Sequence, residues 1–291
     1  MFTINESIFT HEGGKMSAVN STPQSAPSEF EDILYEVEET YAVITINRPE
    51  SFNSFRSITV DELIEAFTLA WGDNRVRSII LTGAGEKAFC AGGDVKQKAQ
   101  TGDYGPSRYG MFRISELHKV MRSVPKPVIS AVNGVAVGGG NVLSTLCDIT
   151  IAASHARFGQ AGPKVGSFDA GYGSAFLARV IGEKRAREMW YFCELIDAKK
   201  AESWGLVNEV VEAGELLPRA KERARDLGLK APTALRFLKQ SFNADTEMQT
   251  GFTNLAMSAL DLYAHSPESH EGAAAFAEKR TPDFSRFDGA Y

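Results

Sequence analysis

Residues 127–154, PVISAVNGVAVGGGNVLSTLCDITIAAS, decide the fold class of this chain. They begin with an apolar, β-branched run and pass through a cluster of three glycines at 138–140. An apolar stretch of helical length follows, and a second β-branched run ends the segment. A strand, a glycine turn, a helix and a strand in this order are typical of α/β layered domains.

Comparable patterns lie on the N-terminal side of this segment. YAVITINRP (41–49) predicts a strand closed by a proline turn, and VDELIEAFTLAWG (60–72) has apolar residues at helical spacing. VRSIILTGAG (76–85) predicts a buried strand, and EKAFCAGGD (86–94) is expected to be a loop. Strands that alternate with helices support the α/β prediction.

The C-terminal part of the chain has a different pattern. A polar segment at 95–110 leads into a helix predicted over 112–124, and after Val211 the strand patterns give way to four helical ones. We therefore predict a flexible N-terminal extension at 1–30, an α/β core at 31–211, and a helical oligomerisation and lid region at 212–291.

The composition narrows the class of protein. The 291 residues are 43% hydrophobic and 23% charged, with a net charge of -6 and no run rich in lysine and arginine, which argues against a nucleic-acid partner. No apolar run approaches the length of a membrane span. The three cysteines, Cys90, Cys147 and Cys193, lack metal-ligand spacing, and the first thirty residues lack a secretory signal. We expect a cytoplasmic protein that binds no metal.

Two glycine clusters follow predicted strands, FCAGGD (89–94) and AVGGGNV (136–142). Unpaired backbone N–H groups at such turns, especially at a helix N-terminus, can bind an oxygen atom that gains negative charge, forming an oxyanion hole. Neither cluster matches the dinucleotide or Walker phosphate motifs. Close packing of a helix on a strand explains either cluster alone equally well.

A third glycine-rich stretch, FGQAGPKVGSFDAGYG (158–173), carries side chains capable of chemistry. Five glycines stand among its sixteen residues, and Ser167 and Asp169 are set between them. One explanation is a surface turn cluster in which both side chains bond to nearby backbone. The other is a loop that wraps closely around a ligand.

In their order along the chain, these blocks resemble the crotonase (enoyl-CoA hydratase/isomerase) superfamily. The resemblance covers roughly residues 32–287 and includes INRPESFNSF, AFCAGGD, PKPVISAVNGVAVGGG, CDITIAA, ARFGQAGPKVG, AKKAESWGLVNEVV and EGAAAFAEKRTPDF. It implies a spiral core of repeated ββα units and an acyl-CoA substrate. The enolate of the thioester would be held by the N–H groups of Gly93 and Gly139. CoA belongs to the substrate, so no tightly bound cofactor is expected, and the implied CoA-binding positions are Phe52, Ala91, Asp94, Lys96, Lys279 and Arg280.

The chain departs from the family's hydratases at both of their catalytic glutamates. Val142 and Gly162 occupy those positions. Neither residue can activate water or return a proton, so ordinary enoyl-CoA hydration is not expected.

The 158–173 stretch is similar to a branch of the family that contains 2-ketocyclohexanecarboxyl-CoA hydrolase and 1,4-dihydroxy-2-naphthoyl-CoA synthase. In that branch a serine, an aspartate and a C-terminal tyrosine do the chemistry, and Ser167, Asp169 and Tyr263 match them. A structural tyrosine at a subunit interface is the alternative for Tyr263.

Within the branch, the sequence favours the ring-opening hydrolase. Asn141 stands where synthases usually have histidine, and Phe52 replaces an arginine that synthases use near the CoA phosphates. Gly162 does not separate the two, because some synthases have glycine there and recruit bicarbonate as the base. The synthase therefore remains an alternative, with bicarbonate as its co-reactant, as does a non-catalytic acyl-CoA-binding scaffold. The resemblance also implies a homo-oligomer, either a trimer or a dimer of trimers.

Overall fold

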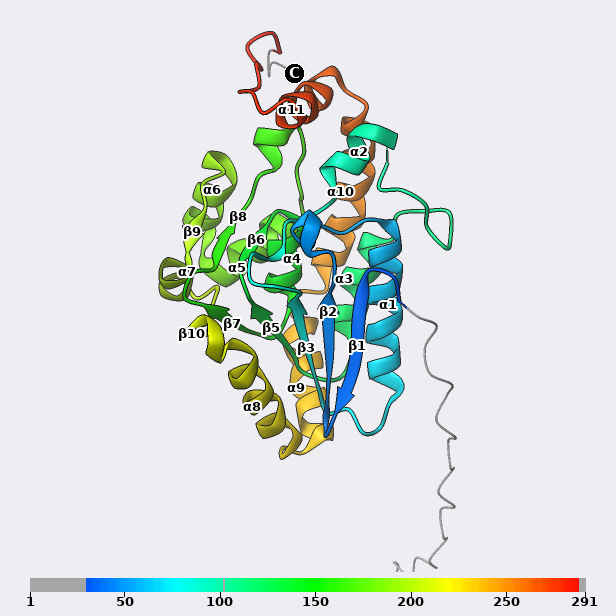
Figure 1. Ribbon diagram of the computed structural model, residues 1–291, viewed down its shortest axis with the longest axis vertical. Helices are drawn as coiled ribbons and strands as arrows, with labels where there is room; N and C mark the ends of the chain where they lie inside the picture. The colour runs from blue at the N-terminus through cyan, green and yellow to red at the C-terminus, as the bar shows by residue number, and fades with distance from the viewer. Residues whose placement is uncertain (1–29, 102, 288–291) are drawn as a thin grey trace, which may run out of the picture.

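The computed structural model describes residues 30–101 and 103–287, and its elements form two β-sheets surrounded by helices (Figure 1). The predicted flexible extension lies outside the described residues, except for Phe30, which packs against the hydrophobic core.

The larger sheet has six strands. Their spatial order is β1 (Ile33–Glu38), β2 (Tyr41–Ile46), β3 (Ser78–Gly83), β5 (Val128–Val132), β7 (Ile149–Ala153) and β10 (Glu209–Val211). β1 runs antiparallel to β2 and the other neighbours are parallel. Every residue of β3 and β5 is buried, as expected for parallel strands with both faces covered.

The smaller sheet has four short strands, in the order β4 (Ala88–Cys90), β6 (Val135–Val137), β8 (Arg157–Gly159) and β9 (Ile196–Asp197). β3, β5 and β7 are each followed along the chain by a strand of this sheet. The prediction of an α/β fold with repeated ββ units is confirmed. The loop prediction for 86–94 is wrong at β4, because a strand of three residues exists only through its pairing with β6.

Helices fill the space beside the sheets. They are α1 (Ser57–Gly72), α2 (Val95–Thr101), α3 (Ile114–Ser123), α4 (Gly139–Leu146), α5 (Leu177–Ile181), α6 (Glu183–Phe192) and α7 (Ala198–Trp204). α1 buries Val60, Leu63, Phe67 and Ala70, whose spacing puts them on one face of the helix. This face contributes to the main hydrophobic core, which also receives side chains from both sheets.

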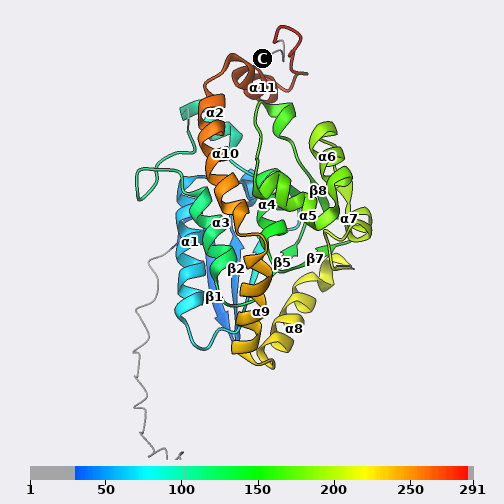
Figure 2. The same cartoon turned by 180° about the vertical axis from the view of Figure 1, so that it is seen from behind.

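The C-terminal part is helical, as predicted: α8 (Leu216–Gly228), α9 (Pro232–Ala244), α10 (Met248–Ala264) and α11 (Pro267–Ala277). α8 covers the second face of the larger sheet, where Leu216, Ala220 and Ala224 pack in a separate apolar cluster. α2, α11 and one end of α10 gather at one end of the molecule (Figures 1 and 2). α8 thus belongs to the packing of the sheet, whereas α10 and α11 reach the glycine-rich loop.

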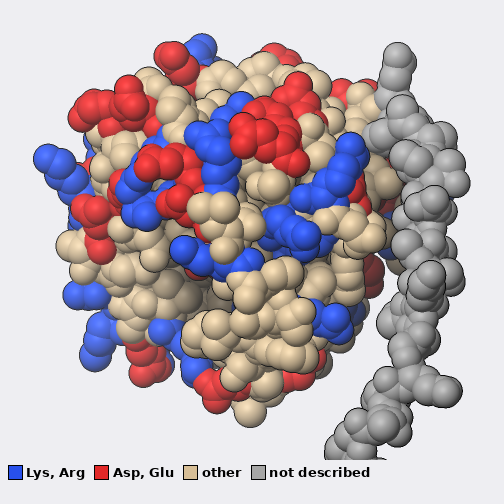
Figure 3. Space-filling model, turned by 90° about the horizontal axis from the view of Figure 1, so that it is seen from below, with Lys and Arg blue, Asp and Glu red and all other residues tan. Residues whose placement is uncertain are grey.

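No described helix has both the length and the apolar character needed to cross a membrane. On the face seen from below, side chains of both charges are interspersed beside an uncharged area (Figure 3). This face therefore carries neither a purely positive nor a purely negative patch across its whole area.

Leu63→Ala tests the core packing of α1. Leu63 is 0% exposed, so its truncation leaves a cavity, and we expect a loss of about 2–5 kcal/mol in the free energy of unfolding. The matched control is Leu34→Ala on β1, which is 47% exposed and should change that free energy by about 0.5 kcal/mol or less. Denaturant titration of both variants makes the comparison, and equal losses would contradict this account of the core.

Candidate functional site

The two predicted oxyanion turns lie against each other. A short parallel bridge joins Phe55 to Gly93, with the Phe55 N–H donating to the Gly92 carbonyl at 2.8 Å. A Cβ atom built on Gly92 would lie 3.1 Å from the backbone nitrogen of Gly139, the first residue of α4. Among the described residues, neither the Gly93 nor the Gly139 N–H donates a hydrogen bond. The fold therefore offers two neighbouring unpaired donors, one of them at a helix N-terminus.

Neither glycine has room for a side chain. A Cβ on Gly139 would lie 2.5 Å from the ring of Phe55, and one on Gly93 would lie 2.6 Å from the ring of Tyr104. The sequence left two explanations for the glycine clusters, close packing and oxyanion binding. At these two glycines both can hold at once. Both glycines are only partly buried.

Tyr104 was not singled out by the sequence analysis, yet its hydroxyl lies 2.8 Å from the Cβ position of Gly93. Burial, together with the nearby carboxylates of Asp94 and Asp169, raises the pKa of Tyr104 to about 12. Tyr104 therefore keeps its proton at neutral pH and can donate a hydrogen bond beside the oxyanion turns. The only sequence signal was an aromatic residue in the polar segment that follows Gly93.

The glycine-rich loop owes part of its composition to the helices that cover it. Gly166 and Gly171 have positive φ angles of 67° and 74°. A Cβ atom on Gly166 would lie 2.5 Å from the Ser269 carbonyl of α11, and one on Gly171 would lie 2.2 Å from the Thr253 hydroxyl of α10. The loop is therefore a packed element beneath α10 and α11 and not an open surface turn.

Asp169 lies in this loop in a setting that disfavours its charge. The residue as a whole is half-buried, but protein surrounds its carboxyl group, and this burial raises the pKa of Asp169 from 3.8 to about 7. A hydrogen bond from the Gly173 backbone N–H opposes this shift. A carboxyl group with this pKa can exchange a proton near neutral pH.

Trp190 of α6 packs against the glycine-rich loop. The sequence analysis did not single it out. Its indole N–H donates to the Gly173 carbonyl at 2.6 Å. Its ring lies 2.8 Å from the Cβ position of Gly162, where hydratases of the family are expected to have glutamate. The indole and the Ser167 carbonyl occupy the space that such a side chain would need.

Phe168, the residue after Ser167, packs against Tyr263. Ser167 is half-buried and donates its backbone N–H to the Gly162 carbonyl at 2.8 Å. The Phe168 and Tyr263 rings have centroids 5.6 Å apart, and the Tyr263 hydroxyl donates to Glu268 at 3.1 Å. The structure thus brings Tyr263 of α10 to the loop that carries Ser167 and Asp169 within one chain.

The predicted CoA-binding residues near the first turn differ in their surroundings. Phe52 is 51% exposed, and its carbonyl accepts a hydrogen bond from the Ala91 N–H at 3.1 Å. Lys96 is exposed on α2. Asp94 instead pairs with Arg48 at 3.0 Å and accepts the Gln97 N–H at 3.1 Å. Its carboxylate therefore fixes the start of α2.

At the C-terminal end, Lys279 is exposed, whereas Arg280 has two carboxylate partners. The Arg280 guanidinium bonds Glu271 at 2.5 Å and Glu278 at 2.6 Å. Arg280 therefore ties the end of the chain to α11, and Lys279 is the more available cation for a phosphate.

A buried amide adjoins Gly162. Gln160 is 1% exposed, and neither its side-chain oxygen nor its nitrogen has a hydrogen-bond partner among the described residues. The Asn141 side-chain oxygen on α4 is likewise buried without a partner. Unpaired buried amides are costly, so these two side chains are exceptional among the buried polar groups.

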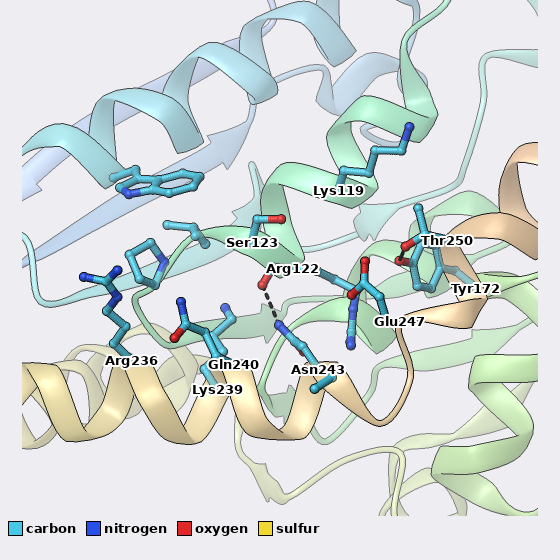
Figure 4. Close-up of a pocket in the computed structure, with 14 residues that line it drawn as sticks. Lys119, Arg122, Ser123, Tyr172, Arg236, Lys239, Gln240, Asn243, Glu247 and Thr250 are labelled. Carbon is cyan, nitrogen blue, oxygen red and sulfur yellow. Dashed lines mark hydrogen bonds between the residues drawn. The ribbon is translucent and has the colours of Figure 1, made fainter.

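A hollow of about 800 Å³ lies elsewhere, between α3, α9 and the start of α10 (Figure 4). Its wall includes Arg122, whose carbonyl accepts a hydrogen bond from Asn243 at 2.7 Å, as drawn there. None of the predicted site residues lines it, and Tyr172 alone connects it with the glycine-rich loop. The predicted site residues thus lie away from this hollow.

The raised pKa of Asp169 predicts a pH dependence of stability. Between pH 3.8 and about 7 the native protein keeps a proton that the unfolded chain has lost, so this carboxyl's stabilising contribution decreases as pH rises through about 7. Asp169→Asn stays neutral throughout. From about pH 5 to pH 8, the wild type should lose stability relative to this variant in denaturant titrations. Parallel pH profiles for the two proteins would refute the assignment.

Known proteins share both this sequence pattern and this fold. Residues 36–286 match the model of the enoyl-CoA hydratase/isomerase family. An enoyl-CoA hydratase from Mycobacterium avium subsp. paratuberculosis K-10 aligns with a TM-score of 0.78 and 27% identity, over 88% of this chain and 99% of its own.

Two further solved structures are similar. A carnitinyl-CoA dehydratase from Mycobacterium avium 104 is 32% identical, with a TM-score of 0.75 over 84% of this chain and 96% of its own. An enoyl-CoA hydratase from Bacillus anthracis is 33% identical, with a TM-score of 0.67 over 87% of this chain and 98% of its own. With its two sheets, its covering helices and its paired glycine turns, the chain belongs to the enoyl-CoA hydratase/isomerase family, the crotonase superfamily.

Proposed function

We propose that this acyl-CoA-processing enzyme hydrolyses a cyclic β-keto-acyl-CoA and opens its ring. The observation that carries the proposal is Asp169, a carboxyl group with a pKa of about 7 in a loop beside the oxyanion turns. The two glutamate positions of the hydratases hold Val142 and Gly162, which leaves Asp169 as the carboxyl group of the glycine-rich loop.

The reaction begins with the addition of water to the ring ketone. Asp169 takes a proton from the water, and the hydroxide adds to the ketone carbon to give a tetrahedral intermediate. The bond from this carbon to the thioester α-carbon then breaks, and its electron pair forms the thioester enolate. The N–H groups of Gly93 and Gly139 stabilise the enolate oxygen. Return of the proton to the α-carbon completes the hydrolysis and gives an open-chain carboxylic acid that retains the CoA thioester.

The remaining side chains orient the reacting groups. The Tyr104 hydroxyl, protonated at neutral pH, donates a hydrogen bond to an oxygen of the substrate beside Gly93. Ser167 holds the attacking water or the ketone, and Tyr263 closes the acyl pocket from α10 through its contact with Phe168. Phe52 and Lys279, whose side chains are exposed, are available to bind the CoA moiety.

Ring closure of o-succinylbenzoyl-CoA by a synthase is the second candidate, and Gln160 favours it. Bicarbonate bound by the unpaired Gln160 amide would supply a base for proton abstraction. The enolate would use the same two N–H groups, because its charge is the same in either direction.

The proposal includes assembly into a trimer or a dimer of trimers. Large apolar side chains are exposed along the C-terminal helices, with Phe242 75%, Leu255 70% and Leu262 76% exposed. Such exposure is typical of a face that a second subunit covers.

A side-by-side assay tests the activity. We expect turnover of 2-ketocyclohexanecarboxyl-CoA, followed as loss of the enolate absorbance, and no turnover of o-succinylbenzoyl-CoA. The reverse result would establish the synthase. Binding of both thioesters without turnover would establish an acyl-CoA-binding scaffold.

Asp169→Asn tests the mechanism, because it keeps the shape of the side chain and removes its basicity. We expect kcat to fall by about 10²–10⁴-fold with little change in KM, and the acidic limb of the pH–rate profile, near pH 7 in the wild type, to disappear. Ser167→Ala should cost less, since water can replace a hydroxyl. High residual activity in Asp169→Asn, together with stimulation of the wild type by bicarbonate, would favour the synthase.

Sedimentation velocity tests the assembly. The wild type should sediment as a trimer or hexamer, and Leu255→Asp should shift it to smaller species because a charge cannot be buried at such an interface without a partner. A wild-type monomer that is fully active at nanomolar concentration would exclude the proposed assembly.

A further inference from the structure

Asp61 of α1 is a buried carboxylate that contacts a loop and not the core. It is 3% exposed, and its Oδ2 accepts hydrogen bonds from the Ser107 hydroxyl at 2.8 Å and the Arg108 backbone N–H at 2.9 Å. Its Oδ1 faces the Arg113 guanidinium at 3.6 Å. All three partners belong to residues 103–113, the segment between α2 and α3, which we call the 103–113 loop.

The same loop carries Tyr104 to the oxyanion turns. The Tyr104 carbonyl accepts the backbone N–H of Ser57, the first residue of α1, at 2.8 Å. The Tyr104 ring stacks on Phe112 with centroids 4.4 Å apart, and Phe112 lies 6.2 Å from Phe55, the residue that bridges to Gly93. The two ends of the loop thus meet at the aromatic pair beside the candidate active site.

The middle of the loop has no comparable apolar anchor. Tyr109 and Met111 are each 62% exposed. Arg108 forms ion pairs with Glu65 at 2.7 Å, where both side chains are about a third exposed, and with the buried Glu62 at 3.2 Å. Solvent weakens the exposed pair, whereas bonds to a buried carboxylate are shielded from water. Glu62 holds the loop by this one contact to Arg108, whereas Asp61 holds it by hydrogen bonds from Ser107 and Arg108 and by its contact with Arg113, so Asp61 is the principal attachment of the middle of the loop.

We propose that Asp61 is a positioning residue of this enzyme: it fixes the 103–113 loop on α1 and so keeps the Tyr104 hydroxyl over Gly93, where the acyl group is bound. The inference rests on the proposed function for the role of Tyr104, whereas the attachment of the loop to α1 can be measured without any reaction. A displacement of about 1 Å in such a group can lower a rate on the order of 10²-fold.

The kinetic test uses Asp61→Asn, with Glu65→Gln as the matched control on the next turn of the same helix. We expect Asp61→Asn to lower kcat on the order of 10-fold to 10²-fold and Glu65→Gln to change it less than about 2-fold. In a Tyr104→Ala background, adding Asp61→Asn should cost less than about 2-fold, because the group that it positions is gone. An equal loss in both backgrounds would refute the positioning role.

Limited trypsin digestion provides the readout that does not depend on activity. Cleavage after Arg108 and Arg113 should be at least about 10-fold faster in Asp61→Asn than in wild type, and unchanged in Glu65→Gln. Ser107→Ala, which removes one partner from the loop side and leaves α1 intact, should accelerate cleavage by a smaller factor and serves if Asp61→Asn does not fold. Unchanged cleavage in a fully active protein would overturn the inference alone. Faster cleavage without turnover of any cyclic thioester would sustain the attachment of the loop and overturn the proposed function.

Discussion

The close approach of two backbone turns, at Gly92–Gly93 and at Gly139, is the constraint on which the rest of the site depends. The Cα of Gly92 lies 3.6 Å from the Cβ position of Gly139, and Phe55 fills the remaining space. Two unpaired N–H groups can lie side by side only where no side chain separates them. The strands before these turns, β4 and β6, are parallel neighbours, so their carboxyl ends deliver both turns to the same edge of the small sheet.

A second consequence of the fold is the desolvation of Asp169. The loop that carries it is covered by α10 and α11, and positive-φ glycines at Gly166 and Gly171 make that contact possible. Burial then raises the pKa of the Asp169 carboxyl to about 7. A change in local solvation thus converts an ordinary aspartate into a group suited to accept a proton at neutral pH.

This chain keeps the family's fold, and in the proposed mechanism Asp169 takes over the acid–base role of the hydratase glutamates. The enzymes to which it is similar include an enoyl-CoA hydratase and a carnitinyl-CoA dehydratase. In this chain Trp190 lies against the Cβ position of Gly162, so the site has no space there for a glutamate side chain. The proposed ring-opening chemistry follows from retaining the enolate stabilisation while moving the base to Asp169.

The sequence alone determined the α/β class, the helical C-terminal part and the positions of the glycine turns, because hydrophobic periodicity and glycine spacing are local properties. The choice of Ser167, Asp169 and Tyr263 came from the resemblance to a branch of the crotonase superfamily. The tertiary structure decided what depends on contacts between distant segments. The strand at β4 exists only through pairing, and Tyr104 and Trp190 gain their places from loops and helices far from them in sequence. The pKa of Asp169 likewise depends on how much protein surrounds it. No local pattern encodes these properties, because each arises from groups that folding brings together.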